Sequence, residues 1–217
     1  MSWLLDSLDV EARQAVHAAM RRRRFGRDEV IYHEGDPAES LHLVAKGRVA
    51  IRAVGPTGDS VTLNVLGRDE VHGELALLSD DHRRSATAVA LEASEMLVLD
   101  RRDFDGLCAS NPAIHRMLSI ALAARVRELS AMVQEALYLS SDQRVVRRLH
   151  DLVRIYGTDA DGPVEIPIRQ DALASMAGTA RPTANRVLRD LERCGCVQLA
   201  RGRIVVLDTV ELRRRAR

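Results

Sequence analysis

One segment limits the possible folds of this chain more than any other. The pair Asn111-Pro112 is followed by 27 residues, 113 to 139, that contain neither glycine nor proline. Asparagine is a good N-cap and proline suits the first helical turn, so the pair predicts a helix start. Without an internal breaker, the helix is expected to run to about Leu139. The rest of the chain must fold around one long helix.

Residues 25 to 100, which precede this helix, show a different pattern. Short alternating segments recur about every ten residues, and turns such as Gly35-Asp36-Pro37 separate them. The segments are 29–32, 41–44, 49–52, 61–65 and 96–99. Such spacing predicts an antiparallel β roll or sandwich. Ahead of it, residues 3 to 24 are expected to be helical, with Arg21 to Arg24 as a solvated helix end.

Apolar residues recur along the long helix at spacings of four and three. They are Leu122, Val126, Leu129, Val133 and Ala136. The pattern is typical of helices that pack against one another in a coiled coil. It covers three heptads at most, so a helix buried in the core of its own chain is an alternative. Since a complete β domain precedes the helix, we expect a second copy of the chain to cover these residues.

Residues 140 to 168 lead into a third region. Ser140-Ser141-Asp142 predicts a hinge, and the following residues predict an amphipathic helix that ends at Gly157. A strand is expected at 164–168 after an intervening loop.

Residues 169 to 192 have the pattern of a helix-turn-helix. Leu173, Met176 and Ala177 give the first helix an apolar face, and Gly178 suits a turn with positive φ. Pro182 suits the first turn of the second helix. Ala184, Val187, Leu188 and Leu191 are expected to face the core, and Arg181, Thr183, Asn185, Arg186 and Arg189 to face outward. Arginine can donate to guanine O6 and N7 together, so the second helix is suited to read a major groove.

A basic hairpin and an uneven charge distribution support a nucleic-acid partner for this region. Residues 196–200 and 204–207 flank the turn Arg201-Gly202-Arg203, which predicts a wing. Residues 143–217 carry 15 arginines and 9 acidic residues, a net charge of +6, whereas residues 1–142 carry 17 basic and 22 acidic residues, a net charge of −5. Only the last third is therefore expected to bind a polyanion. A small helical protein-interaction domain is the alternative.

The sequence is expected to be that of a soluble, cytoplasmic globular protein. No apolar run approaches 18 residues, and the N-terminus has no basic-then-apolar signal pattern. Cys108, Cys194 and Cys196 form no CxxC motif and no zinc-ligand spacing, so we expect reduced thiols.

The most specific motif lies within the β region. It consists of His72-Gly73-Glu74-Leu75-Ala76-Leu77-Leu78, followed by Arg83-Arg84-Ser85-Ala86-Thr87-Ala88. This pair of segments resembles the cyclic-nucleotide phosphate-binding cassette of the Crp/Fnr superfamily, and the order of predicted regions is similar over nearly the whole chain. The resemblance implies an α+β fold: an antiparallel β-roll effector-sensing domain in 1–110, a dimerisation helix in 111–139 and a winged helix-turn-helix DNA-binding domain in 143–217.

The same resemblance implies an effector site, and the side chains at the matching positions are suited to bind a cyclic nucleotide. The residues concerned are Gly73, Glu74, Leu75, Ala76, Arg84, Ser85 and Ser130. A guanidinium from Arg84 can neutralise a cyclic phosphodiester, backbone N–H groups near Gly73 can cradle its oxygens, and Glu74 can accept from a ribose hydroxyl. An internal salt bridge between Glu74 and Arg84 is the alternative.

Two positions depart from the family pattern. Where cyclic-AMP-binding relatives carry adjacent Thr and Ser on the long helix, this chain has Leu129 and Ser130. Leucine cannot hydrogen-bond to adenine, so base selectivity is expected to be weaker. Pro182 replaces a glutamate that can accept from cytosine N4, which predicts a different DNA half-site.

The resemblance implies a homodimeric, allosteric transcription regulator rather than an enzyme. Expected ligands are a cyclic nucleotide, cyclic AMP or cyclic GMP, and pseudo-palindromic double-stranded DNA; RNA polymerase is an expected partner. No metal is expected, and the N-terminal region has no cysteine cluster that would hold an iron–sulfur centre. No haem is expected either, because His72 and Cys108 are axial-ligand candidates in name only. A regulator that binds DNA without a cyclic nucleotide, and a nucleotide-binding module that acts on a protein, are the alternatives.

Overall fold

The computed structural model describes residues 8–55, 60–75, 82–157 and 162–216, and the chain forms two compact units. The first unit comprises residues 1–57 and 65–129, and the second comprises 58–64 and 130–217. None of the helices within the described residues has the length and hydropathy that a membrane span requires.

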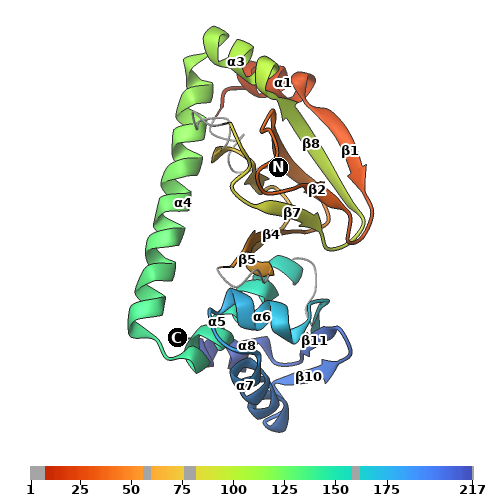
Figure 1. Ribbon diagram of the computed structural model, residues 1–217, viewed down its shortest axis with the longest axis vertical. Helices are drawn as coiled ribbons and strands as arrows, with labels where there is room; N and C mark the ends of the chain where they lie inside the picture. Colours follow the sequence, from red (N-terminus) through yellow and green to blue (C-terminus); the bar gives the residue numbers. More distant parts are fainter. Residues whose placement is uncertain (1–7, 56–59, 76–81, 158–161, 217) are drawn as a thin grey trace. The chain divides into compact units, whose positions relative to one another are not determined.

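An antiparallel β roll is built from the first unit together with residues 60–64 (Figure 1). Its strands are β1 (Arg21–Phe25), β2 (Val30–Tyr32), β3 (Ser40–Lys46), β4 (Val49–Val54), β5 (Ser60–Leu66), β6 (Val71–His72), β7 (Thr87–Ala90) and β8 (Ser94–Asp100). They form two four-stranded sheets, in the orders β1-β8-β3-β6 and β2-β7-β4-β5. Buried residues from both sheets, among them Val44, Met96, Val49 and Ala88, make one core between them. The predicted β roll is confirmed.

A second core lies where helices pack on the roll. These helices are α1 (Val10–Ala19), α3 (Arg101–Ser110) and the start of α4 (Pro112–Tyr138). Val16, Phe104 and Ile114, one residue from each helix, pack in one buried cluster with Leu41 and Leu99 of β3 and β8. Burial of such apolar side chains stabilises the unit by roughly 1.5–3 kcal/mol each.

The prediction of a helix over residues 3 to 24 is wrong at its C-terminal end. Helix α1 ends at Ala19, and Arg21 to Arg24 lie in strand β1 at the edge of the first sheet. Arg22 and Arg24 both donate to the Glu95 carboxylate of the neighbouring strand β8, at 2.7 and 3.0 Å. Charged side chains on an edge strand also discourage pairing with another chain, which gives the arginine run a role in a sheet.

Helix α4 begins and ends close to the predicted limits. The Asn111 side chain accepts from the backbone N–H of Ala113 at 2.9 Å, as expected for a residue at a helix N-terminus. Its first turns are buried, but four later positions are exposed: Val126 (61%), Leu129 (48%), Val133 (59%) and Leu137 (72%). Val126, Leu129 and Val133 belong to the predicted apolar stripe, whose Ala136 is also exposed and whose Leu122 is half-buried; Leu137 was not part of that prediction.

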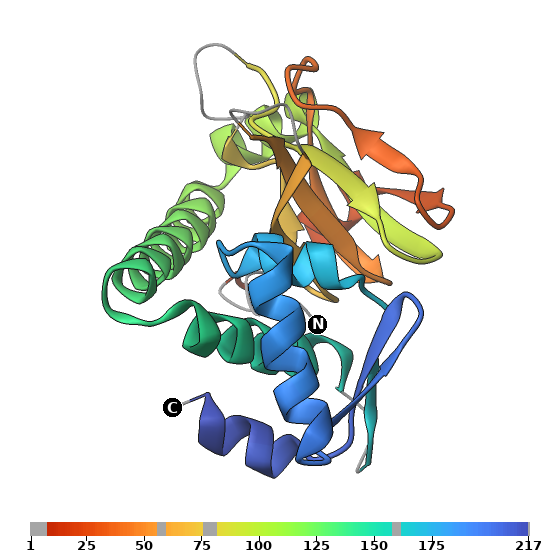
Figure 2. The same cartoon turned by 60° about the horizontal axis from the view of Figure 1, so that its bottom comes forward.

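The second unit carries a helix-turn-helix followed by a hairpin (Figure 2). Its further elements are α5 (Ser141–Tyr156), β9 (Val164–Ile166), α6 (Gln170–Met176), α7 (Arg181–Arg193), β10 (Val197–Ala200), β11 (Arg203–Val206) and α8 (Thr209–Arg215). A capping box between Ser140 and Gln143 starts α5. Gly178 has φ +57° in the turn after α6, and Pro182 lies in the first turn of α7, as predicted.

Candidate functional site

The first candidate site centres on the buried guanidinium of Arg84, whose residue is 5% exposed. Its NH2 group donates to Ser40 Oγ at 3.0 Å, and NH1 donates to the Gly73 carbonyl at 3.3 Å. The Cζ atom lies 4.1 Å from the centre of the Tyr32 ring, within the range of a cation–π interaction. These three contacts are all with neutral groups.

Backbone contacts place Arg84 in this position. Its N–H donates to the Asp36 carbonyl at 2.9 Å, and its carbonyl accepts from the Gly35 N–H at 2.8 Å. Gly73 has φ +86°, and a Cβ there would clash with the Arg84 guanidinium. Glycine is therefore required at position 73 both by backbone conformation and by close approach.

The Arg84 side chain has hydrogen-bonding capacity to spare. The buried Nε has no hydrogen-bond partner, and within the described residues no carboxylate lies within 4.0 Å of the guanidinium. The alternative of a direct Glu74–Arg84 salt bridge is thus not seen in this part of the chain. Burial lowers the pKa of Arg84, while Tyr32, Asp36 and Glu74 oppose the shift. A buried cation held only by neutral groups is suited to receive an anion.

Glu74 lies close to Arg84 and to helix α4. Burial raises the pKa of the Glu74 carboxyl, whereas a backbone hydrogen bond and the charges of Arg125 and Arg84 lower it. Glu128 raises it further. Arg125 is itself paired with Glu128 at 3.0 Å. Glu74 is therefore influenced electrostatically by charged groups of α4 as well as by the buried arginine.

The remaining predicted effector residues are less closely grouped. Leu75 is 46% exposed and Ser85 is also exposed. Ser130 is exposed and belongs to the second unit, and Ala76 lies outside the described residues. The sequence interpretation missed Ser40 and Tyr32. A signal was available for Tyr32, because an aromatic side chain with a polar tip occupies a position in a strand otherwise made of Val and Ile.

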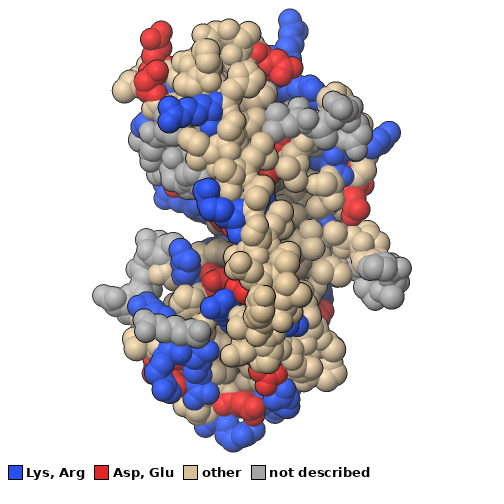
Figure 3. All heavy atoms as spheres, turned by 90° about the vertical axis from the view of Figure 1, so that its left-hand side faces the viewer, with Lys and Arg blue, Asp and Glu red and all other residues tan. Residues whose placement is uncertain are grey.

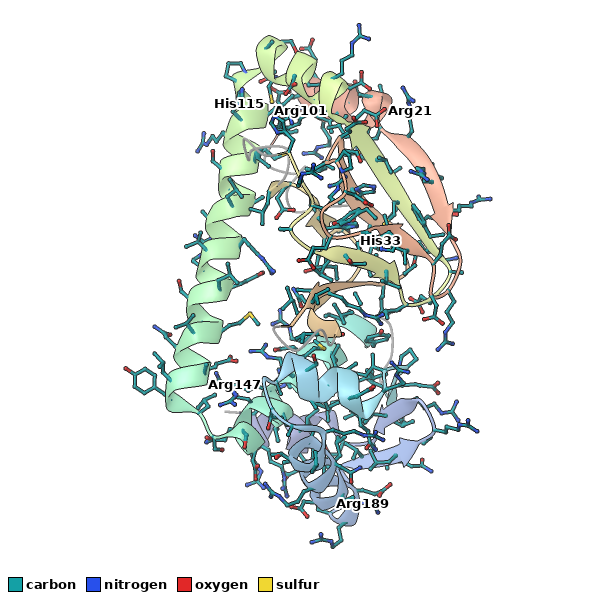
Figure 4. The ribbon with its side chains drawn as sticks, viewed as in Figure 1. Arg21, His33, Arg101, His115, Arg147 and Arg189 are labelled. Atoms are coloured by element: carbon teal, nitrogen blue, oxygen red, sulfur yellow. The ribbon has the colours of Figure 1, made fainter. Side chains whose placement is uncertain are left out.

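The second candidate site is the outward face of α7. Arg181 and Arg189 are exposed, and Thr183 and Asn185 are half-buried. Figure 4 shows Arg189 projecting from α7. A surface hollow on this helix is lined by Arg181, Pro182, Asn185, Arg186, Arg189, Asp190 and Arg193. Ala180 supplies no side-chain cap, so the first backbone N–H groups of the helix have no side-chain capping partner.

Side-chain hydrogen bonds hold part of this face in place. Gln170 of α6 accepts from Asn185 Nδ2 at 2.6 Å, and Asn185 Oδ1 accepts from Arg189 Nε at 3.2 Å. These bonds link the two helices of the motif and set the direction of the Arg189 guanidinium. The sequence interpretation missed Gln170 because its partner lies 15 positions away.

Arg186 is engaged by an acidic residue from outside the motif. It donates to Asp142, near the start of α5, at 2.6 Å, and lies 4.0 Å from Asp190. The Asp142 hydrogen bond is the main reason that the pKa of Arg186 is raised. The sequence interpretation assigned Asp142 to a hinge and did not foresee this contact.

Figure 3 shows the side of the molecule along which α4 lies. Blue arginine and lysine side chains mixed with red acidic ones occupy part of the surface, whereas uncharged residues form a continuous strip along the outward side of α4. The exposed apolar residues of α4 are Val126, Leu129, Val133 and Leu137.

Comparison with family models matches both units. Residues 22–111 match a cyclic nucleotide-binding domain, and residues 143–215 match a Crp-like helix-turn-helix domain. The cyclic AMP receptor protein of Thermus thermophilus is 36% identical over 192 residues, which cover 88% of this chain and 86% of the relative. The global nitrogen regulator of a Nostoc species is 28% identical over 193 residues, covering 88% and 86%.

Solved structures show the same fold. The catabolite activator protein of Thermus thermophilus has 33% identity and a TM-score of 0.57, covering 98% of this chain and 97% of that one. The cyclic-di-GMP-responsive regulator CLP of Xanthomonas campestris has 23% identity and a TM-score of 0.77, covering 92% and 100%. A relative from Mycobacterium tuberculosis, 27% identical over 195 residues that cover 89% of this chain and 87% of the relative, is named a CRP-like cAMP-activated global transcriptional regulator. With both domains matched in order, this chain belongs to the Crp/Fnr family of transcription regulators, with a cyclic nucleotide-binding domain and a Crp-like helix-turn-helix domain.

Proposed function

We propose that this protein is a homodimeric, cytoplasmic DNA-binding regulator controlled by a small anion that binds at Arg84, with cyclic AMP as the first ligand to test. The observation that carries the proposal is the buried Arg84 guanidinium, which has neutral partners and an Nε atom without one. Leaving a buried N–H donor unsatisfied costs about 1–3 kcal/mol. A bound oxyanion removes that cost and neutralises the charge.

A cyclic phosphodiester fits the chemistry of this pocket. Arginine has five N–H donors, of which two contact Gly73 and Ser40, so Nε and further N–H groups can bond oxyanion oxygens. The backbone at Gly73, which carries no Cβ, allows oxygens to approach closely. Glu74 is suited to accept from a ribose hydroxyl, with Arg125 as a nearby cation. Leu75, Ala76 and Ser85 remain proposed contacts from the neighbouring cassette.

The names of related proteins point to different effectors. One relative is named a cyclic AMP receptor, another a nitrogen regulator, and a structural neighbour is described as cyclic-di-GMP-responsive. Position 129 is leucine, which offers no hydrogen bond to a base, while Ser130 retains a hydroxyl. Cyclic AMP, cyclic GMP and cyclic di-GMP are therefore tested together, and a regulator without a nucleotide effector is the second candidate.

The exposed stripe of α4 supports homodimerisation. Val126, Val133 and Leu137 are each more than half exposed, and they follow the spacing of a helix–helix contact. Exposed apolar stripes of this kind mark interaction surfaces. A two-fold pair places two α7 helices on successive major grooves about 34–36 Å apart. We propose that ligand binding favours one arrangement of the paired helices, which is how an effector acts allosterically.

On DNA, we propose that Arg181 and Arg186 read bases. Thr183, Asn185 and Arg189 contact phosphates or assist the two base readers. Pro182 cannot accept a hydrogen bond from cytosine, so the half-site is expected to differ from that of relatives with glutamate there. RNA polymerase is a further proposed partner.

Calorimetry with cyclic AMP, cyclic GMP and cyclic di-GMP tests the effector. We expect saturable binding of at least one, and Arg84→Gln to weaken it by about thirtyfold or more, because a buried charged hydrogen bond is lost. Arg83→Gln is the matched control, since it removes the same charge from the exposed neighbouring residue. If no nucleotide binds but the protein still binds duplex DNA, the effector-free regulator is favoured. A monomer that binds no duplex contradicts the whole proposal.

A further inference from the structure

Three aromatic rings lie packed together, and one of them, Tyr32, lies beneath Arg84. Tyr32 lies 5.5 Å from both His42 and His72 between ring centroids, and the two imidazoles are stacked at 5.0 Å with an interplanar angle of 11°. His42 and His72 are directly paired across strands β3 and β6, which explains their stacking. Both histidines are only 3% exposed.

This cluster fixes the position of Tyr32. The Tyr32 hydroxyl and His72 Nδ1 are hydrogen-bonded at 2.8 Å. The ring held in this way is the one that lies under the Arg84 guanidinium at 4.1 Å. One continuous series of contacts therefore runs from the paired strands through His72 and Tyr32 to Arg84.

A cluster that served only as structural core would lower the stability of the fold, because it buries polar atoms without hydrogen-bond partners. His42 Nδ1, His72 Nε2 and Arg84 Nε are all buried without a hydrogen-bond partner. Apolar side chains of similar size would avoid this desolvation penalty, so a buried polar group of this kind calls for a functional explanation. Arg84 is the group to which such an explanation points, because the Tyr32 ring contacts it directly and its charge acts on both histidines.

Burial, with a smaller contribution from nearby charges, lowers the pKa of both histidines. Burial lowers the pKa of His42 to about 3, with further lowering by Arg84 and by Arg23 of β1. Burial, His42 and Arg84 together hold the pKa of His72 well below its ordinary value. Glu74 and Asp36 are the acidic groups that act on Tyr32 or Arg84. Arg84 is thus the single cation at the centre of this cluster.

We propose that Tyr32 and His72 are positioning residues for the anion site: the Tyr32 ring fixes the plane of the Arg84 guanidinium, and His72 fixes Tyr32. This inference rests on the proposed function, because it assumes that Arg84 receives an anion. When an aromatic ring packs against the face of a guanidinium, the N–H groups at its edge keep a fixed direction. This fixed direction favours bidentate binding of an oxyanion. The aromatic face also stabilises the buried charge without occupying an N–H donor.

The test compares Tyr32→Leu, Tyr32→Phe and a matched control, Phe25→Leu. Phe25 is a buried aromatic residue of the same roll, and it lies beneath a different arginine, Arg23. The Arg84 Nε–H NMR resonance, assigned with Arg84→Lys, is followed during titration with inorganic phosphate as the simplest probe. We expect a ring-current-shifted resonance in the wild type and in Tyr32→Phe, and loss of that shift in Tyr32→Leu.

Phosphate affinity should follow the same order. Tyr32→Leu is expected to weaken binding by about tenfold, the size of a desolvated cation–π contact, and Tyr32→Phe to restore it to within about threefold of the wild type. His72→Phe, which removes the hydrogen bond to Tyr32, is expected to weaken binding by about threefold. Phe25→Leu should lower thermal stability without changing affinity. Unchanged affinity in Tyr32→Leu, or equal loss in Phe25→Leu, overturns the inference.

The two proposals fail in distinguishable ways. If no cyclic nucleotide binds, but phosphate shifts the Arg84 resonance and the shift depends on Tyr32, the effector class is wrong and the positioning role stands. If nucleotides bind with equal affinity to wild type and Tyr32→Leu, the function stands and the positioning role is overturned. An Arg84 resonance that responds to neither phosphate nor nucleotides overturns both.

Discussion

Arg84 in the first unit and the arginines of α7 in the second carry the same charge in opposite surroundings. Arg84 is 5% exposed and is held by a serine hydroxyl, a backbone carbonyl and a tyrosine face. On α7, the Arg186 side chain is 57% exposed and is held by the Asp142 carboxylate, and Arg189 by the Asn185 amide. Arg84 is buried with neutral groups as its direct partners, whereas Arg186 and Arg189 are solvent-exposed and already hydrogen-bonded.

The difference shows that burial or exposure decides how an arginine side chain binds anions. A buried guanidinium loses its hydration, so it gains most from a single anion that fits its N–H groups. Exposed guanidinium groups keep their hydration and act through the sum of many weak phosphate contacts. We therefore expect shape-selective binding at Arg84 and strong dependence on ionic strength at α7.

The largest expected effect is a contrast in salt dependence. Raising NaCl from about 50 to about 200 mM should lower DNA affinity by about a thousandfold or more, because each phosphate contact releases a counterion. Effector affinity should fall by less than about tenfold, since a buried pair is screened less than an exposed one. Fluorescence anisotropy of a labelled duplex measures the DNA affinity, and calorimetry measures the effector affinity. Equal salt slopes would remove the distinction between the sites.

The next expected effect is acid destabilisation of the buried cluster. The folded protein holds the His42 pKa near 3, whereas an unfolded histidine titrates near 6.5. Between these values the unfolded chain binds more protons, so stability is lost as pH falls from about 6.5 toward 3. Between pH 7 and pH 5, His42 alone should lower the free energy of unfolding by about 2 kcal/mol.

Urea unfolding at the two pH values measures this loss. His42→Phe keeps a ring in the stack but cannot titrate, so its loss between pH 7 and pH 5 should be smaller than that of the wild type by about 2 kcal/mol. Identical losses in the two proteins would show that His42 is protonated as easily in the folded roll as in the unfolded chain.

The smallest expected effect concerns the ion pair on α7. Asp142→Asn should release Arg186 and remove a negative charge beside the proposed DNA-binding face of α7. Both changes should raise the affinity for a random duplex, by about three- to tenfold together. Asp171→Asn is the control, because Asp171 is an acidic residue of α6 that pairs with Arg169 instead. Equal gains from both variants would mean that net charge alone, and not the contact with Arg186, limits DNA binding.

Local sequence signals accounted for much of the second unit. Gly178 takes the predicted positive φ, Pro182 starts α7, and Gly202 lies in the hairpin turn with φ +76°. Leu188 and Leu191 face the core as their spacing predicted. These features depend on the conformational limits of single residues and on helical periodicity, which act within a few positions of the chain.

The arginine run at 21–24 shows where local signals fail. Arginine has a good helix propensity, and a helix precedes the run, so a helix end was the natural interpretation. Pairing with β8 decides otherwise, because Glu95 joins Arg22 and Arg24 across the strands and Phe25 is buried in the roll. Propensity differences of a few tenths of a kcal/mol per residue are readily outweighed by such tertiary contacts.

By itself, the sequence determined the order of the regions, the long helix and the turns of the helix-turn-helix, and it identified Gly73 and Arg84 as candidate site residues. Only the tertiary structure decided which polar groups meet: His42 with His72, Tyr32 with Arg84, and Asp142 with Arg186. The reason is that helices and turns are specified by neighbours along the chain. Contacts between residues tens of positions apart depend on strand register and helix packing, which no local pattern specifies.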